Sequence, residues 1–107
     1  MRLDMVIALV PEVAADDLTD WIARRWVVPA GTAPDWAFAE IDVARIRLVH
    51  DLRQGLGVEE DSVGLVLSLL DQVYDLRHRL GAILAAAERQ PGPVRDALLA
   101  ALFPHPP

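Results

Sequence analysis

DDLTDWIARRWVVPAG, residues 16–31, carries the pattern on which the fold prediction rests. Its apolar residues recur at spacings of three and four, which predicts a helix over residues 16–26 with one buried face. Asp16 or Asp17 suits the N-cap of this helix, and two arginines in its last turn complement the helix dipole. The buried face consists of Leu18, Trp21, Ile22 and Trp26.

The segments on either side of this helix are shorter. Residues 27–38, VVPAGTAPDWAF, predict a small β hairpin, or wing, in which Trp36 and Phe38 anchor the second piece to the core. Residues 5–10, MVIALV, predict either a short strand or the start of a small helix. Pro11 and Glu12 suit a first helical turn.

A helix followed by a wing has the outline of a DNA-reading element, yet three aspartates open this one. Two explanations stay open: the acids only cap the helix, or a DNA-binding scaffold has been turned to bind protein. The chain of 107 residues has a formal net charge of −6, and all ten of its basic residues are arginine. Such a chain is repelled by phosphates and suits a basic protein partner.

Residues 40–56, EIDVARIRLVHDLRQGL, predict the next helix, which Gly55 and Gly57 would end. Its expected buried stripe is Ile41, Ala44, Leu48, Leu52 and Leu56, flanked by Val49. The opposite, polar side offers Arg45, His50, Asp51 and Arg53.

Residues 59–89 predict a long helix with acids at its N-terminus. Apolar residues alternate at spacings of three and four, which predicts a coiled-coil seam. We expect a homodimer, with the orientation of its two strands left open. The seam is Val66, Leu69, Val73, Leu76, Leu80, Ile83 and Ala87. A second flank, expected to cover the N-terminal part, is Val63, Leu67, Leu70 and Tyr74.

After the helix-ending QPGP at 90–93, residues 93–103 predict a short amphipathic helix, whose default role is to cover the dimer seam. Val94, Leu98, Leu102 and Phe103 form its apolar side. The chain is thus expected to be mainly α and one compact domain overall. Its parts are a head at 1–57, a dimerisation helix at 58–90 and a C-terminal helix and tail at 91–107.

No catalytic constellation stands out, and we predict neither enzyme activity nor a cofactor. Asp71, Asp75 and His78 share one helix face and could hold a divalent ion, but we expect a solvated face in which Asp75 pairs with Arg79. His50 and His105 have the pattern of ordinary surface residues. The chain has no cysteine, no signal peptide pattern and no membrane-length apolar run, and we expect a cytoplasmic location.

The order of elements resembles the MerR-like winged helix-turn-helix fold with a long dimerisation helix. Within that group the chain is similar to chaperone modulators of the CbpM type. Three motifs carry the resemblance: Trp36-Ala37-Phe38 at the end of the wing, RLVHDL at 47–52 and LSLLDQVYDLRHRL at 67–80. The resemblance covers roughly residues 16–88. The chain departs from the family before residue 16, where an aromatic-bearing helix is absent, and in its added C-terminal helix.

The resemblance implies a dimer that binds the J-domain of a DnaJ-like, curved-DNA-binding co-chaperone and inhibits its work with a DnaK-type chaperone. J-domains dock through a basic helix, which an acidic partner would accept. The surface expected to bind is the polar side of the 40–56 helix with neighbouring acids of the long helix. Its residues are Arg45, His50, Asp51, Arg53, Asp71 and Asp75.

Two other functions stay open. A MerR-type transcriptional regulator would contact phosphates through Arg24, Arg25, Arg45, Arg47 and Arg53. A structural or antitoxin-like dimer would bind some other protein. A membrane role is not expected.

Overall fold

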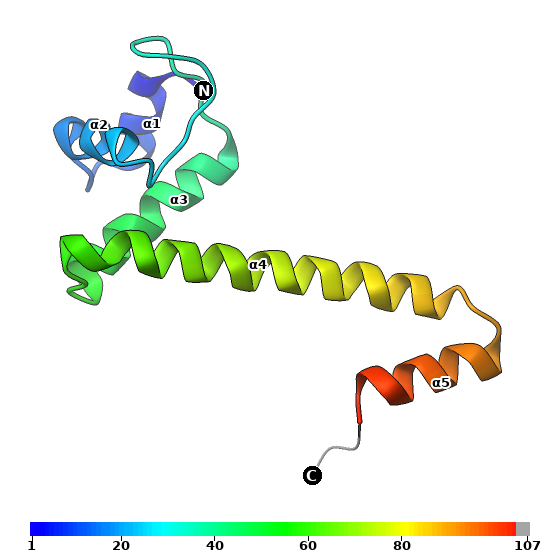
Figure 1. Ribbon diagram of the computed structural model, residues 1–107. Helices are drawn as coiled ribbons and strands as arrows, with labels where there is room; N and C mark the ends of the chain where they lie inside the picture. The colour runs from blue at the N-terminus through cyan, green and yellow to red at the C-terminus, as the bar shows by residue number, and fades with distance from the viewer. Residues whose placement is uncertain (105–107) are drawn as a thin grey trace. The chain divides into compact units, whose positions relative to one another are not determined.

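A computed structural model describes residues 1–104 of the chain, and residues 105–107, with His105 and most of the expected tail, lie outside it. The described part is mainly helical, as predicted (Figure 1). The helices are α1 (Leu3–Leu9), α2 (Ala15–Ala23), α3 (Glu40–His50), a π-helical turn η1 (Asp51–Gly55), α4 (Glu60–Glu88) and α5 (Gly92–Leu102). The chain divides into two compact units, Met1–Leu67 and Ser68–Pro107, and the division falls inside α4.

Helix α1 confirms the helical alternative for the N-terminal apolar run. It ends before Pro11, so the helix start expected at Pro11 and Glu12 is wrong. Val10 donates its N–H to the carbonyl of Val6 at 3.0 Å, and both side chains are fully buried. Proline has no N–H to continue the helical ladder, so Pro11 cannot extend this helix.

Helix α2 is shorter at its C-terminal end than the pattern predicted. Ala14 and not an aspartate is the N-cap, Arg24 is the C-cap, and no basic residue lies in the last turn. Arg25 takes the left-handed conformation with φ +63°, which is a common way to end a helix. The reversal lets Trp26 donate its N–H to the carbonyl of Trp21 at 3.0 Å and leaves the Trp26 side chain buried.

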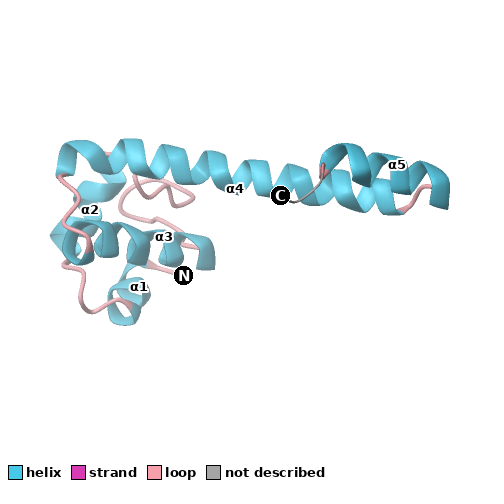
Figure 2. Ribbon diagram, turned by 90° about the horizontal axis from the view of Figure 1, so that it is seen from below, coloured by secondary structure: helices cyan, strands magenta, loops and turns pink. Residues whose placement is uncertain are grey.

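The expected β wing is not confirmed. Residues 27–38 hold one isolated antiparallel bridge, between Ala30 and Ala37, and Figure 2 draws the segment as loop. Two N–H···O bonds of 3.0 and 2.8 Å make this bridge. Pro29 and Pro34 lack N–H donors, which limits pairing beyond it. Phe38 pairs with Met1, to whose carbonyl it donates its N–H at 2.7 Å.

The buried face predicted for the 40–56 helix is only partly right: Leu52 and the flanking Val49 are buried as expected, and Leu48 is partly buried. Val43, Ile46 and Val49 are buried in α3, whereas Ile41 is 70% exposed and Leu56, beyond η1, is 76% exposed. Residues spaced by three advance about 300° around a helix, so the buried strip winds by about 60° at each step. The strip winds because its residues join one core cluster with residues of α1, α2 and α4. The helical segment ends at Gly55, as predicted, and Gly57 follows with φ +63°.

Helix α4 begins and ends within one residue of the prediction. Val63 and Leu67 are buried in the core of the first unit, as expected. Leu70 and Tyr74, predicted to join them, are exposed because they lie beyond the last core residue of that helix. Helix α5 also lies within one residue of its predicted bounds, with Pro93 in its first turn, although Val94, Leu98, Leu102 and Phe103 are all exposed.

The winding strip on α3 is testable with two matched substitutions in one helix. Ile46→Ala should lower the free energy of unfolding by about 2–5 kcal/mol, because Ile46 is fully buried. Ile41→Ala should change it by no more than about 0.5 kcal/mol. Urea denaturation measures both, and equal losses from the two variants would contradict the observed face.

Candidate protein-binding surfaces

Two of the arginines expected to face a partner form hydrogen bonds within the fold. Arg45 donates from Nε to the carbonyl oxygen of Trp26 at 2.9 Å. Arg53 donates from Nη1 to the carbonyl oxygen of Val58 at 2.9 Å. Both side chains belong to half-buried residues, and both satisfy carbonyls in segments that lie outside the α-helices. Both side chains therefore have a structural role in the first unit.

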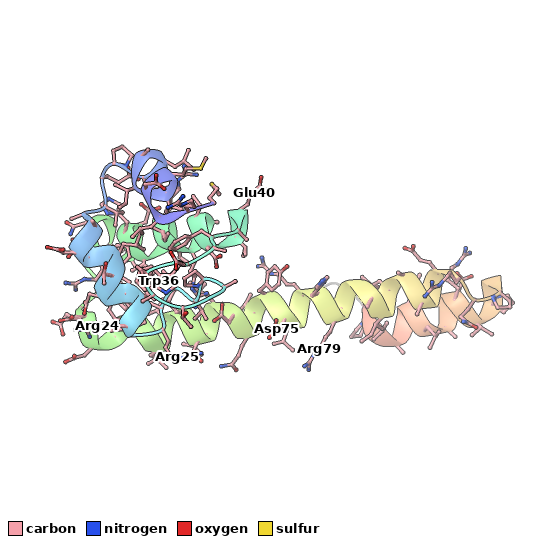
Figure 3. All side chains as sticks on the ribbon, turned by 90° about the horizontal axis from the view of Figure 1, so that it is seen from above. Arg24, Arg25, Trp36, Glu40, Asp75 and Arg79 are labelled. Carbon is pink, nitrogen blue, oxygen red and sulfur yellow. The ribbon has the colours of Figure 1, made fainter. Side chains whose placement is uncertain are left out.

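A third arginine joins the end of α2 to the start of α4. Arg24 forms ion pairs with Asp20, at 2.9 Å, and with Glu60 in the first turn of α4. Its guanidinium also lies over the Trp26 ring, 5.2 Å from the ring centroid. Figure 3 labels Arg24 among the side chains of the first unit. Arg24 is thus held by two carboxylates and an aromatic face, an arrangement that sequence periodicity alone could not predict.

The net charge of the chain lies in the first unit. Met1–Leu67 holds twelve acids against six arginines, whereas the second unit holds four acids and four arginines. Asp42 is half-buried and accepts the Ala39 N–H at 2.8 Å, and the other eleven acids of the first unit are exposed. The first unit therefore presents a surface of excess negative charge.

The six residues predicted as one binding surface are divided between the two units. Arg45, His50, Asp51 and Arg53 belong to the first unit, and only Asp51 among them is exposed. Asp71 and Asp75 lie on the exposed surface of α4 in the second unit. The exposed member that lies on the acidic unit is Asp51, at the start of η1.

A groove in the first unit was not foreseen. It has a volume of about 660 Å³ and lies between the N-terminal residues and the loop before Phe38. Its lining is Met1, Arg2, Leu3, Asp4, Met5, Pro34, Asp35, Trp36 and Ala37. Trp36 is partly buried and packs against the core, and Phe38 is buried, so both lie where a wing anchor would. The groove escaped sequence analysis because its two walls lie about 30 residues apart in the chain.

The predicted dimer seam is largely open. Val66 packs partly buried against the core of the first unit. The next five seam residues, from Leu69 to Ile83, are between 40% and 63% exposed. Ala87, the last seam residue, is buried at 3% exposure. An apolar row of this length on an exposed helix is a surface suited to association.

Other chemistry has little support within residues 1–104. No group of three His, Cys, Asp or Glu side chains there is arranged to hold a metal ion. The His78 ring lies 5.8 Å from the ring of Tyr74. No helix in the described range has the length and apolar character needed to cross a membrane.

Comparisons of the chain with models of protein families, with curated proteins and with solved structures found no match.

The structural duty of Arg53 gives a second test. Arg53→Met should lower the free energy of unfolding by about 1–2 kcal/mol, because the Val58 carbonyl loses a charged hydrogen-bond donor. Arg47→Met, at an exposed position of α3, should stay within about 0.5 kcal/mol. Thermal and urea denaturation of the pair measure this, and an Arg53 variant as stable as the Arg47 variant would contradict a structural role for the Arg53 hydrogen bond.

Proposed function

We propose that the protein is a non-catalytic chaperone modulator. It binds the J-domain of a DnaJ-like co-chaperone, blocks the access of that co-chaperone to a DnaK-type chaperone, and acts in the cytoplasm as a homodimer. The observation that carries the proposal is the set of eleven exposed acids on a first unit with a net charge of −6.

The chemistry of a J-domain supports this choice of partner. A basic docking helix is attracted to a surface of excess negative charge, and such complementarity raises the rate of association and the specificity. The groove beside Trp36 adds an apolar floor for a partner side chain, with Asp4 and Asp35 among its lining residues. A surface that combines a pocket with surrounding charge is suited to protein recognition.

The first unit is, in this proposal, a winged helix-turn-helix head of the MerR-like type. Helices α1 and α2 correspond to the helix-turn-helix pair, residues 27–38 to a wing reduced to one bridge, and α3 to the helix that follows the wing. The order of elements, from α1 through α4, supports the correspondence.

The alternative, a MerR-type DNA-binding regulator, is less well supported. Of the five arginines that it requires, Arg24, Arg45 and Arg53 already bind carboxylates or backbone carbonyls within the first unit. Arg25 and Arg47 are the exposed pair that is left, on a unit of net negative charge. Affinity for DNA depends on the number of phosphates neutralised, so this set predicts little binding.

Homodimerisation through the α4 seam is part of the proposal. Leu69, Val73 and Leu76 repeat at heptad positions on the exposed helix, and the same row on a second copy would cover them.

Calorimetric titration with the J-domain tests the function directly. We expect saturable binding at one J-domain per subunit, weaker at moderate than at low salt, because charge complementarity drives it. Asp51→Arg should raise the Kd about tenfold, which corresponds to about 1.4 kcal/mol.

The matched control is Asp96→Arg, the same charge reversal at an exposed position of α5 in the neutral unit. Its Kd should equal that of the unmodified chain. Equal effects of the two reversals would show that total charge, and not a surface on the first unit, governs binding. Absence of binding at both salt concentrations would remove the J-domain proposal and direct attention to DNA fragments.

A further inference from the structure

The second unit does not bury its own large apolar side chains. Within residues 68–104, eleven of these side chains are exposed, and the remaining two, Leu84 and Leu99, are only partly buried. The one buried residue of this range is the small Ala87. A helical hairpin that hides so little apolar surface lacks the main source of folding free energy.

The two helices of this unit leave an apolar groove between them. The groove has a volume of about 350 Å³, with Ile83, Ala86 and Ala87 on the α4 side. Leu98, Ala101 and Leu102 line the α5 side. Three alanines among these six residues leave room for larger side chains to enter. Figure 2 shows α5 beside the end of α4.

The groove is continuous with the dimer seam. Ile83 belongs to both, and Leu80 and Leu76 precede it on the same face of α4 at spacings of three and four. The exposed row of α4 and the exposed side of α5 therefore form one apolar surface. A partner that covered α4 alone would leave Leu98 and Leu102 in water.

We infer that the α4–α5 hairpin is half of a helical bundle that the hairpin of a second copy completes. Helix α5 lies in the core of this bundle, and apolar side chains of the second copy fill the groove at Ala86, Ala87 and Ala101. The inference rests on the homodimer proposed above, extends its interface from α4 to α5, and is independent of the J-domain.

Charge favours a second copy over other occupants. The second unit has four acids and four arginines, so neither a basic nor an acidic partner gains from its net charge. A helix that binds a lipid surface carries a strongly basic polar face, whereas α4 has Asp71, Asp75 and Glu88 beside its arginines. A two-fold dimer, by contrast, places the same apolar surface on both sides of the interface.

The amount of apolar surface also suits a dimer. Fully burying a large apolar side chain contributes about 1.5–3 kcal/mol, which at about 25 cal/mol per Å² corresponds to roughly 100 Å² of apolar surface. A side chain that is about half exposed therefore offers on the order of 50 Å² for burial by a partner. Eleven such residues offer on the order of 500 Å² of apolar surface per copy. Stable interfaces bury about 800 Å² per partner in total, polar atoms included.

Two neighbouring alanines in α5 provide a matched test. Ala101 lines the groove, whereas Ala100 is exposed and lies outside its lining. Ala101→Glu and Ala100→Glu add the same side chain and the same charge to the same helix. In sedimentation equilibrium the unmodified chain and the Ala100 variant should be dimers at micromolar concentration. The Ala101 variant should have a dimer Kd at least tenfold higher.

The possible results distinguish a role of α5 in the interface from dimerisation through α4. A dimer of unchanged Kd in the Ala101 variant would contradict a role of α5 while leaving the α4 dimer intact. A monomeric unmodified chain at 100 µM would contradict both and assign the surface to another occupant. Neither outcome changes the J-domain titration, which measures the first unit.

A measurement on the unmodified chain guards against a variant that fails to fold. Amide hydrogen exchange should show protection of α5 that falls on dilution below the dimer Kd, because the helix is expected to depend on the second copy. Protection of α5 that does not depend on concentration would overturn the inference.

Discussion

The apolar strip that winds along α3 is the constraint on which the first unit depends. Val43, Ile46 and Val49 are spaced by three, so successive side chains face different neighbours around the helix. One core cluster therefore includes residues of α1, α2 and the first turns of α4 together with this strip. The carbonyls of Trp26 and Val58, in the connecting segments, are held by arginine side chains of α3 and η1. The segment formed by α3 and η1 therefore supplies both core side chains and the arginine donors that bind these two carbonyls.

The use of arginine side chains to hold the fold together leaves the exposed surface of the first unit acidic. Arg24, Arg45 and Arg53 bind groups of the protein itself, whereas eleven acids of the first unit stay exposed. The first unit then presents negative charge outward, which suits a basic protein partner and not a phosphate backbone. The second unit is neutral and apolar on its open faces, which suits a second copy. Two units of one short chain therefore have different recognition chemistry.

The sequence predicted the bounds of the helices better than it predicted which of their faces are buried. The bounds of α4 and α5 followed from periodicity and from the proline and glycine residues at their ends. The buried face of α3 followed only in part, because a stripe spaced by three and four was available at Ile41 and Ala44 while the core of the fold selects Val43 and Ile46. Arginines on a polar helix side were assigned to a partner, since carbonyls left open in distant loops leave no mark on periodicity. The groove at Trp36 was missed for a similar reason, because its walls are separated in the chain. The J-domain partner and the dimer stay predictions.

The central claim is that partner binding and dimerisation use separate surfaces, one on the acidic unit and one on the apolar hairpin. Sedimentation of the chain mixed with excess J-domain tests it most directly, because the mass of the complex counts both components. We predict a single species of two chains and two J-domains, since the two surfaces belong to different units. A complex of one chain with one J-domain, formed as the dimer dissociates, would contradict the account, because a single surface would then serve both partners.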